Sequence, residues 1–211
     1  YPDGLQRWQL WDELIAVQRE AVDAGEAREP VLDAALAKME RRGELPHGAF
    51  GSLMREALAK PMDELFDRYG KALARWPREL GGDLALSHRW QELKLEDRLG
   101  GLRVAPDGSL ARIVLQASDV IDKGKYRHDK LVRHWVDHVA AQLTGSLTTM
   151  VISKAGSVEF TPIPAETARA QLDALLSAWW QGMSRPLPLA VKTAFAWLDD
   201  PDTARAKYEG G

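Results

Sequence analysis

The chain has 211 residues, 45% hydrophobic and 28% charged, which is an ordinary globular composition and long enough for a sizeable core. Its formal net charge of −3 supplies no long-range attraction to nucleic acid, so any DNA contact must come from a local cluster of cations. The absence of cysteine excludes disulfides and thiolate metal sites. No apolar run reaches membrane-spanning length and no signal peptide is recognisable, so we expect a cytoplasmic protein without membrane contact. Because the chain starts at Tyr1 rather than Met, we also expect a piece of a larger protein.

The first third of the chain has helical periodicity. Helices are predicted over residues 5–24, 30–42 and 50–76. Pro61 falls inside the third of these and is expected to kink it. Pro77 and the Gly81-Gly82 pair then mark a change from helical to β character. We therefore expect a helical portion at 1–80 and an αβ portion at 81–211.

The second portion mixes strands and helices. Alternating apolar residues predict that a strand over 93–99 pairs with one over 110–117, around a turn at 106–108. A second hairpin is predicted within 147–163, and helices are expected to begin near residues 129, 164 and 189.

The first of these hairpins resembles the core of metal-dependent nucleases, but without their catalytic groups. Such nucleases place an acid and a lysine two residues apart on the second strand, where they hold a divalent cation and the attacking water. Here Leu115 and Ala117 occupy those positions. Neither side chain binds a metal or moves a proton. The sequence therefore predicts a mixed α/β fold whose core is a catalytically dead PD-(D/E)xK nuclease-like domain.

An alternative set of nuclease residues is Asp83 with Glu92 and Lys94, which has the acid and acid-x-lysine spacing in a β context. Glu92 and Lys94 alternate with apolar neighbours, however, as on the solvated side of a half-buried strand. Asp97 lies on the apolar side of the same pattern, so we expect it to be buried with Arg98 or Arg112 within reach. It is either a structural hydrogen-bond acceptor or a remnant of a lost metal site. An active nuclease using Asp83, Glu92 and Lys94 remains the alternative.

His134 and His138 are four residues apart, as two zinc ligands on one helical face would be. A zinc protease helix would carry glutamate directly after the first histidine, whereas this chain has Trp135. No third ligand is evident from the sequence. We therefore expect two structural histidines, with no metal and no cofactor.

Two segments are candidate DNA contacts. Residues 123–128 read KGKYRH and interleave cations with an aromatic ring, so Lys123, Lys125 and Arg127 suit phosphates and Tyr126 suits stacking on an unpaired base. A solvated loop is the competing interpretation. The turn at Lys154 is the second candidate, as a narrow projection.

Eight tryptophans exceed the needs of a core of this size, and Trp179 and Trp180 are adjacent. Adjacent helical residues point about 100° apart, so both cannot sit centrally on one buried stripe. One interpretation is that one packs while the other covers the core edge. The other is an aromatic anchor for a partner chain.

An ordered set of segments along almost the whole chain resembles the C-terminal domain of the RecC family, the gamma subunit of bacterial exodeoxyribonuclease V. The segments are GLQRWQ at 4–9, GELPHGAFG at 43–51, LEDRLGGL at 95–102, the turn at 106–108, IVLQAS at 113–118, YRHDKL at 126–131, QGMSRPL at 181–187 and ARAKYEG at 204–210.

The resemblance implies a nuclease-like fold that has lost catalysis. It also implies a non-catalytic scaffold in a RecBCD-type complex for double-strand break repair, with the RecB and RecD subunits and DNA as partners. In that family the domain helps to separate the duplex and guide single strands. A general single-strand binding domain using the loop at 123–127 is a further alternative.

Overall fold

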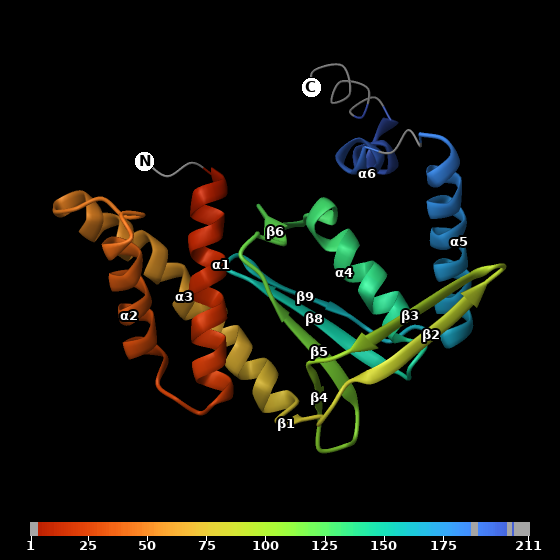
Figure 1. Ribbon diagram of the computed structural model, residues 1–211, viewed down its shortest axis with the longest axis horizontal. Helices are drawn as coiled ribbons and strands as arrows, with labels where there is room; N and C mark the ends of the chain where they lie inside the picture. The colour runs from red at the N-terminus through yellow and green to blue at the C-terminus, as the bar shows by residue number, and fades with distance from the viewer. Residues whose placement is uncertain (1–3, 187–189, 202–203, 205–211) are drawn as a thin grey trace. The chain divides into compact units, whose positions relative to one another are not determined.

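The computed structural model describes residues 4–186, 190–201 and 204 (Figure 1). Residues 187 and 205–210 of the two last resembling segments, and the expected helix start at 189, lie outside that range. The protein is a mixed α/β chain that divides into two compact units. The first comprises Tyr1–Arg75, Val114–Ile121 and Val151–Val158, and the second comprises Trp76–Ile113, Asp122–Met150 and Glu159–Gly211.

Three helices make up most of the first unit: α1 (Gly4–Asp23), α2 (Arg28–Arg41) and α3 (Ala49–Arg75). They confirm the helices predicted from periodicity, and α3 continues through Pro61. Their buried faces meet in an apolar core that includes Leu14, Met39 and Leu65. At its edge the Arg28 guanidinium donates to Gln18 and to Asp63, at 2.8 and 2.6 Å.

The strands form three sheets. The largest has the order β1-β4-β5-β8-β9, built from β1 (Arg78–Glu79), β4 (Leu102–Val104), β5 (Leu110–Leu115), β8 (Leu147–Ser153) and β9 (Gly156–Phe160). The other two sheets are two-stranded ribbons: β2 (Leu84–Trp90) pairs with β3 (Leu93–Leu99), and β6 (Ile121–Asp122) pairs with β7 (Lys125–Tyr126). The hairpin predicted within 147–163 is confirmed as β8–β9.

The predicted pairing of residues 93–99 with 110–117 is wrong. Strand β3 pairs with β2, with Leu84 opposite Leu99 and Trp90 opposite Leu93. The predicted turn at 106–108 does form, but it joins the short β4 to β5. Gly101, at φ 67, turns the backbone between β3 and β4, so the two strands do not continue as one. As a result β3 pairs with β2, and β4 pairs with β5.

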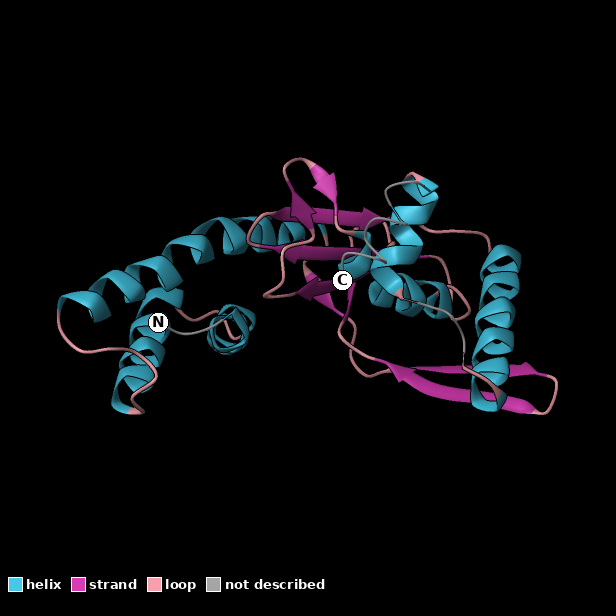
Figure 2. Ribbon diagram, turned by 90° about the horizontal axis from the view of Figure 1, so that it is seen from above, coloured by secondary structure: helices cyan, strands magenta, loops and turns pink. Residues whose placement is uncertain are grey.

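Three helices complete the second unit: α4 (His128–Ala141), α5 (Ala165–Ser184) and α6 (Val191–Asp199), close to the predicted positions. One side of α4 packs on α5, where buried Val139 lies against Ala168 and Leu172. Helix α5 also crosses the β2–β3 ribbon, to which it is joined by His88 Nε2 and Asp173 Oδ1 at 2.7 Å (Figure 2). The second unit thus has its own core around α4 and α5.

The start of α3 is packed so closely at Gly51 that a substitution there can test the packing. A Cβ on Gly51 would collide with the backbone carbonyl of Pro46, which cannot rotate away as a side chain does. We expect Gly51→Ala to lower the free energy of unfolding by about 1–3 kcal/mol, the usual cost of overpacking. Thermal or urea unfolding followed by circular dichroism measures the change.

Gly70 is the matched control, because it lies in the same helix with open space around the position of a Cβ. Gly70→Ala should raise the free energy of unfolding by about 0.5–1 kcal/mol through helix propensity alone. Equal effects of the two substitutions would contradict the packing described for Gly51.

Candidate nucleic-acid interface

The predicted DNA-binding loop folds into a tight hairpin. Lys123 (φ 48) and Gly124 (φ 75) both have left-handed backbone conformations between β6 and β7, as a two-residue type I′ turn requires. Glycine and asparagine are usual at such positions, whereas the left-handed backbone conformation is unfavourable for a lysine. The turn projects Lys123 and places Lys125 and Tyr126 on the strand that follows it. The sequence did not predict this hairpin because its strands have only two residues each.

A pocket of about 470 Å³ lies between this hairpin, the start of α4 and helix α6. Helix α6 contributes Lys192, Phe195, Ala196 and Asp199, which are spaced so that they share one helical face. The Phe195 ring contacts His128 with ring centroids 5.3 Å apart, which joins the two walls. Sequence reasoning missed this second wall, since only the fold brings residues 192–199 beside residues 122–129.

The pocket contains charges of both signs. Arg127 is paired with Asp129 at 3.5 Å. The ammonium groups of Lys123, Lys125 and Lys192 have no hydrogen-bond or ion-pair partner among the described residues. The Tyr126 side chain is 61% exposed at the pocket, so its ring face is open for stacking. The hairpin therefore presents available cations beside an available aromatic ring.

Lys154 is in a different environment from the loop lysines. Its side chain is 9% exposed, and its ammonium lies over the Trp11 ring at 4.1 Å, pairs with Asp119 at 3.2 Å and donates to the Ala117 carbonyl. Burial lowers the Lys154 pKa, and Asp119 opposes that shift. The ammonium already has its partners, so this turn offers no free cation to a phosphate. Arg68, which donates to the Lys154 carbonyl at 3.0 Å, further fastens the turn to α3.

The alternative nuclease residues are not brought together. Asp83 precedes β2 at one end of the β2–β3 ribbon, whereas Glu92 lies in the turn at the other end. Lys94 is opposite Arg89, six residues after Asp83, which corresponds to about 20 Å along a strand. Carboxylates that share a divalent cation each lie within about 2.6 Å of it. Lys94 instead pairs with Glu96 at 2.6 Å.

Leu115 and Ala117 lie at and just beyond the end of β5. Leu115 is half-buried and Ala117 is 2% exposed, so both serve packing in the first unit. The expectation that Asp97 is buried is wrong, because Asp97 is exposed and accepts a bond from the Arg98 backbone N–H at 2.7 Å. Arg112 pairs with Asp137 at 3.1 Å rather than with Asp97.

The two histidines of the zinc-like spacing are both buried in the core of the second unit. His138 Nε2 lies 3.1 Å from the Thr161 carbonyl, which fixes it as the donor, and Nδ1 accepts from the Thr149 hydroxyl at 2.9 Å. Both ring nitrogens of His138 are therefore used in hydrogen bonds. Within the described residues, no group of three or more potential metal ligands occurs.

Trp179 and Trp180 are 52% and 50% exposed on α5, so neither is packed into the core. Leu175 and Met183 lie four residues before and after Trp179 and are also exposed. Residues at that spacing form a stripe along one helical face. The structure thus presents an apolar surface around Trp179, here called the α5 stripe.

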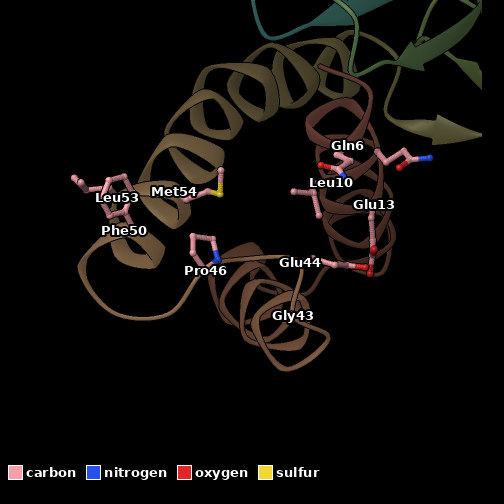
Figure 3. Close-up of a pocket in the computed structure, with 10 residues that line it drawn as sticks. Gln6, Leu10, Glu13, Gly43, Glu44, Pro46, Phe50, Leu53 and Met54 are labelled. Carbon is pink, nitrogen blue, oxygen red and sulfur yellow. The ribbon is translucent and has the colours of Figure 1, made fainter. Parts of the chain in front are cut away.

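The first unit has a cavity of about 710 Å³ between α1 and the start of α3. Figure 3 shows Leu10 and Met54 facing it from opposite sides. Glu13 and Glu44 at its rim are both bound by Arg42 at 2.6 Å, and the hydrogen bond from Arg42 lowers the Glu13 pKa. Among the described residues, no lysine or arginine lines this cavity, so it does not suit a phosphate.

The family model of the RecC C-terminal domain matches residues 1–201, nearly the whole chain. The chain belongs to this family. Among curated proteins, the RecBCD enzyme subunit RecC of Escherichia coli (strain K12) is 23% identical to it over 210 residues, which cover 93% of this chain and 16% of that protein. The chain therefore spans about a sixth of the length of this relative, and the predicted resemblance is confirmed.

No helix in the described part of this RecC-family domain is long and apolar enough to cross a membrane.

The buried histidines predict how stability depends on pH. Burial lowers the pKa of His134 and of His138 below the ordinary value of about 6.5. As the pH falls below 6.5, the unfolded chain takes up protons that the folded protein resists, so the free energy of unfolding should decrease until the lowered pKa values are passed. Urea unfolding between pH 5 and pH 7 measures this slope.

His138→Gln should reduce the slope, because one of the two buried imidazoles no longer titrates. His47, whose side chain is 84% exposed, provides the matched control His47→Gln, which should leave the slope as in the parent protein. An identical pH dependence in His138→Gln would show that the buried imidazole does not cause it.

Proposed function

We propose that this domain is a non-catalytic DNA-handling and scaffold part of a RecBCD-type helicase-nuclease complex in double-strand break repair. The observation that carries the proposal is the hairpin at 122–126, which presents unpaired cations and the exposed Tyr126 in one pocket. Membership of the RecC family and the similarity to a RecBCD subunit supply the biological setting. Lysines bind phosphates without reading sequence, and an exposed ring stacks on an unpaired base. Such a site suits a single DNA strand that moves past the domain, because neither contact depends on the base sequence.

The proposal that the domain is catalytically inactive, with a nuclease-like core, rests on the residues that a nuclease would use. The positions expected for the acid and the lysine hold Leu115 and Ala117. The alternative triad of Asp83, Glu92 and Lys94 is spread along the β2–β3 ribbon. Two-carboxylate metal catalysis needs ligands around a common ion, and this register separates them.

DNA binding by the domain alone should be weak and sensitive to salt. Replacing Lys123 by Asn, which tolerates the left-handed backbone, together with Lys125→Ala and Arg127→Ala removes the charges of the hairpin. Each phosphate contact on single-stranded DNA contributes about −0.7 to the slope of log affinity against log salt. We expect a slope of roughly −2 to −3 in the parent domain and a slope about 2 units shallower in the triple variant. Fluorescence anisotropy with forked and single-stranded DNA at several salt concentrations measures both.

The matched control removes three exposed cations elsewhere, Lys60, Lys71 and Arg169, and thus makes the same change in net charge. Its slope should equal that of the parent domain. A slope that the hairpin variant does not change would place DNA binding on another surface. The same DNA incubated with Mg²⁺ or Mn²⁺ should remain uncut, and cleavage abolished by Glu92→Ala would restore the nuclease alternative.

We further propose that the α5 stripe contacts a partner subunit of the RecB or RecD kind. An exposed apolar stripe around Trp179, with the exposed Trp180 beside it, is typical of an interface anchor, and truncation of such an anchor costs about 2 kcal/mol or more in binding. Trp179→Ala with Trp180→Ala in the full-length subunit should therefore weaken capture of RecB and RecD by roughly 30-fold or more.

The matched control is Phe50→Ala with Leu53→Ala, which removes an exposed apolar pair from α3. Capture should be unchanged in this control, with the same melting temperature in both variants. Normal capture by the tryptophan variant would exclude the α5 stripe as the contact.

A further inference from the structure

The pocket between the β6–β7 hairpin and α6 has features that a simple phosphate-binding groove does not need. Asp122 and Asp199 both line it, and neither carboxylate has a hydrogen-bond or ion-pair partner among the described residues. A carboxylate repels a phosphate by about 1 kcal/mol at 4 Å even in water. The ligand that fits such a pocket must therefore bring hydrogen-bond donors as well as anionic oxygens.

We propose that this pocket holds one unstacked nucleotide of a single DNA strand, with a base that carries an exocyclic amino group. The inference rests on the function proposed above and names its ligand. The phosphate is bound by Lys123, Lys125 and Lys192, and the amino group donates to Asp122 or Asp199. Cytosine and adenine have this amino group, whereas thymine presents a carbonyl oxygen at the same edge.

The size and walls of the pocket agree with one nucleotide. Its volume of about 470 Å³ lies within the range of small-molecule sites. The Tyr126 ring is open to stacking, while the Phe195 ring already contacts His128 and forms part of the wall. In a duplex both faces of a base are stacked on its neighbours, so a base that stacks on the Tyr126 ring comes from a single strand.

Helix α6 is essential to this inference. Lys192 and Asp199 lie seven residues apart on the face that lines the pocket, one near each end of the helix. They place a cation and a carboxylate on the wall opposite the hairpin. The hairpin alone has two unpaired cations, Lys123 and Lys125, and the ring of Tyr126, which bind a strand without distinguishing its bases.

The test compares two pyrimidine homopolymers, oligo(dC) and oligo(dT), by fluorescence anisotropy at constant salt. The parent domain should bind oligo(dC) about five- to tenfold more tightly, within the range for one base-edge contact. Asp122→Asn with Asp199→Asn should reduce that ratio to about one without weakening either complex, because repulsion of the phosphates decreases as well. Lys192→Ala should weaken both homopolymers by the same factor and make the salt slope shallower by about 0.7.

The outcomes separate this inference from the proposed function. Equal affinity for oligo(dC) and oligo(dT), with a salt slope that still depends on Lys123 and Lys125, would overturn the nucleotide pocket and leave the DNA-binding function in place. A cytosine preference that survives both Asn substitutions would also overturn it. A salt slope independent of the hairpin cations would overturn both. Circular dichroism of each variant confirms that α6 and the rest of the fold are intact.

Discussion

The second unit depends on a buried polar network that fastens α4 to β8. His138 bonds to Thr149 and to the Thr161 carbonyl, and Gln142 donates to the Leu147 carbonyl at 2.8 Å. Buried polar groups are costly unless they are paired, so each of these bonds allows only one position of the helix on the strand. The first turn of the same helix carries His128 and Asp129, which form one side of the candidate DNA pocket. The core thus determines where the surface site lies.

The cations of this chain differ in what they can bind, although the sequence gives them equal charge. Lys154 is desolvated and held by Asp119 and the Trp11 ring, so its charge is used within the first unit. Lys123 and Lys125 stand on an exposed turn without such partners. A solvated, unpaired ammonium can neutralise a DNA phosphate, and the release of the cations condensed around that phosphate drives binding. The hairpin and α6 are therefore the proposed DNA interface, rather than the β8–β9 turn.

Register explains why the acidic residues do not assemble a metal site. The spacing of Asp83, Glu92 and Lys94 matched a nuclease pattern in one dimension, but the antiparallel β2–β3 ribbon places the first residue at one end and the other two at the opposite end. This separation follows from which strand pairs with which, so the pairing decides the chemistry of the ribbon more than the residue types do. The Asp137 carboxylate, on α4, is already paired with the Arg112 guanidinium on β5.

The sequence by itself determined the helical elements, the β8–β9 hairpin, the family resemblance and the residues of the basic loop. Helical periodicity and turn residues act over a few neighbouring positions, so they can be read locally. Only the tertiary structure decided that β3 pairs with β2, that Asp97 is exposed and that Lys154 is buried. It also brought Lys192 and Asp199 beside the loop, about 65 residues away in the chain. These outcomes depend on which segments, far apart in the sequence, pack together and bury their apolar side chains. No local pattern in the sequence specifies that packing.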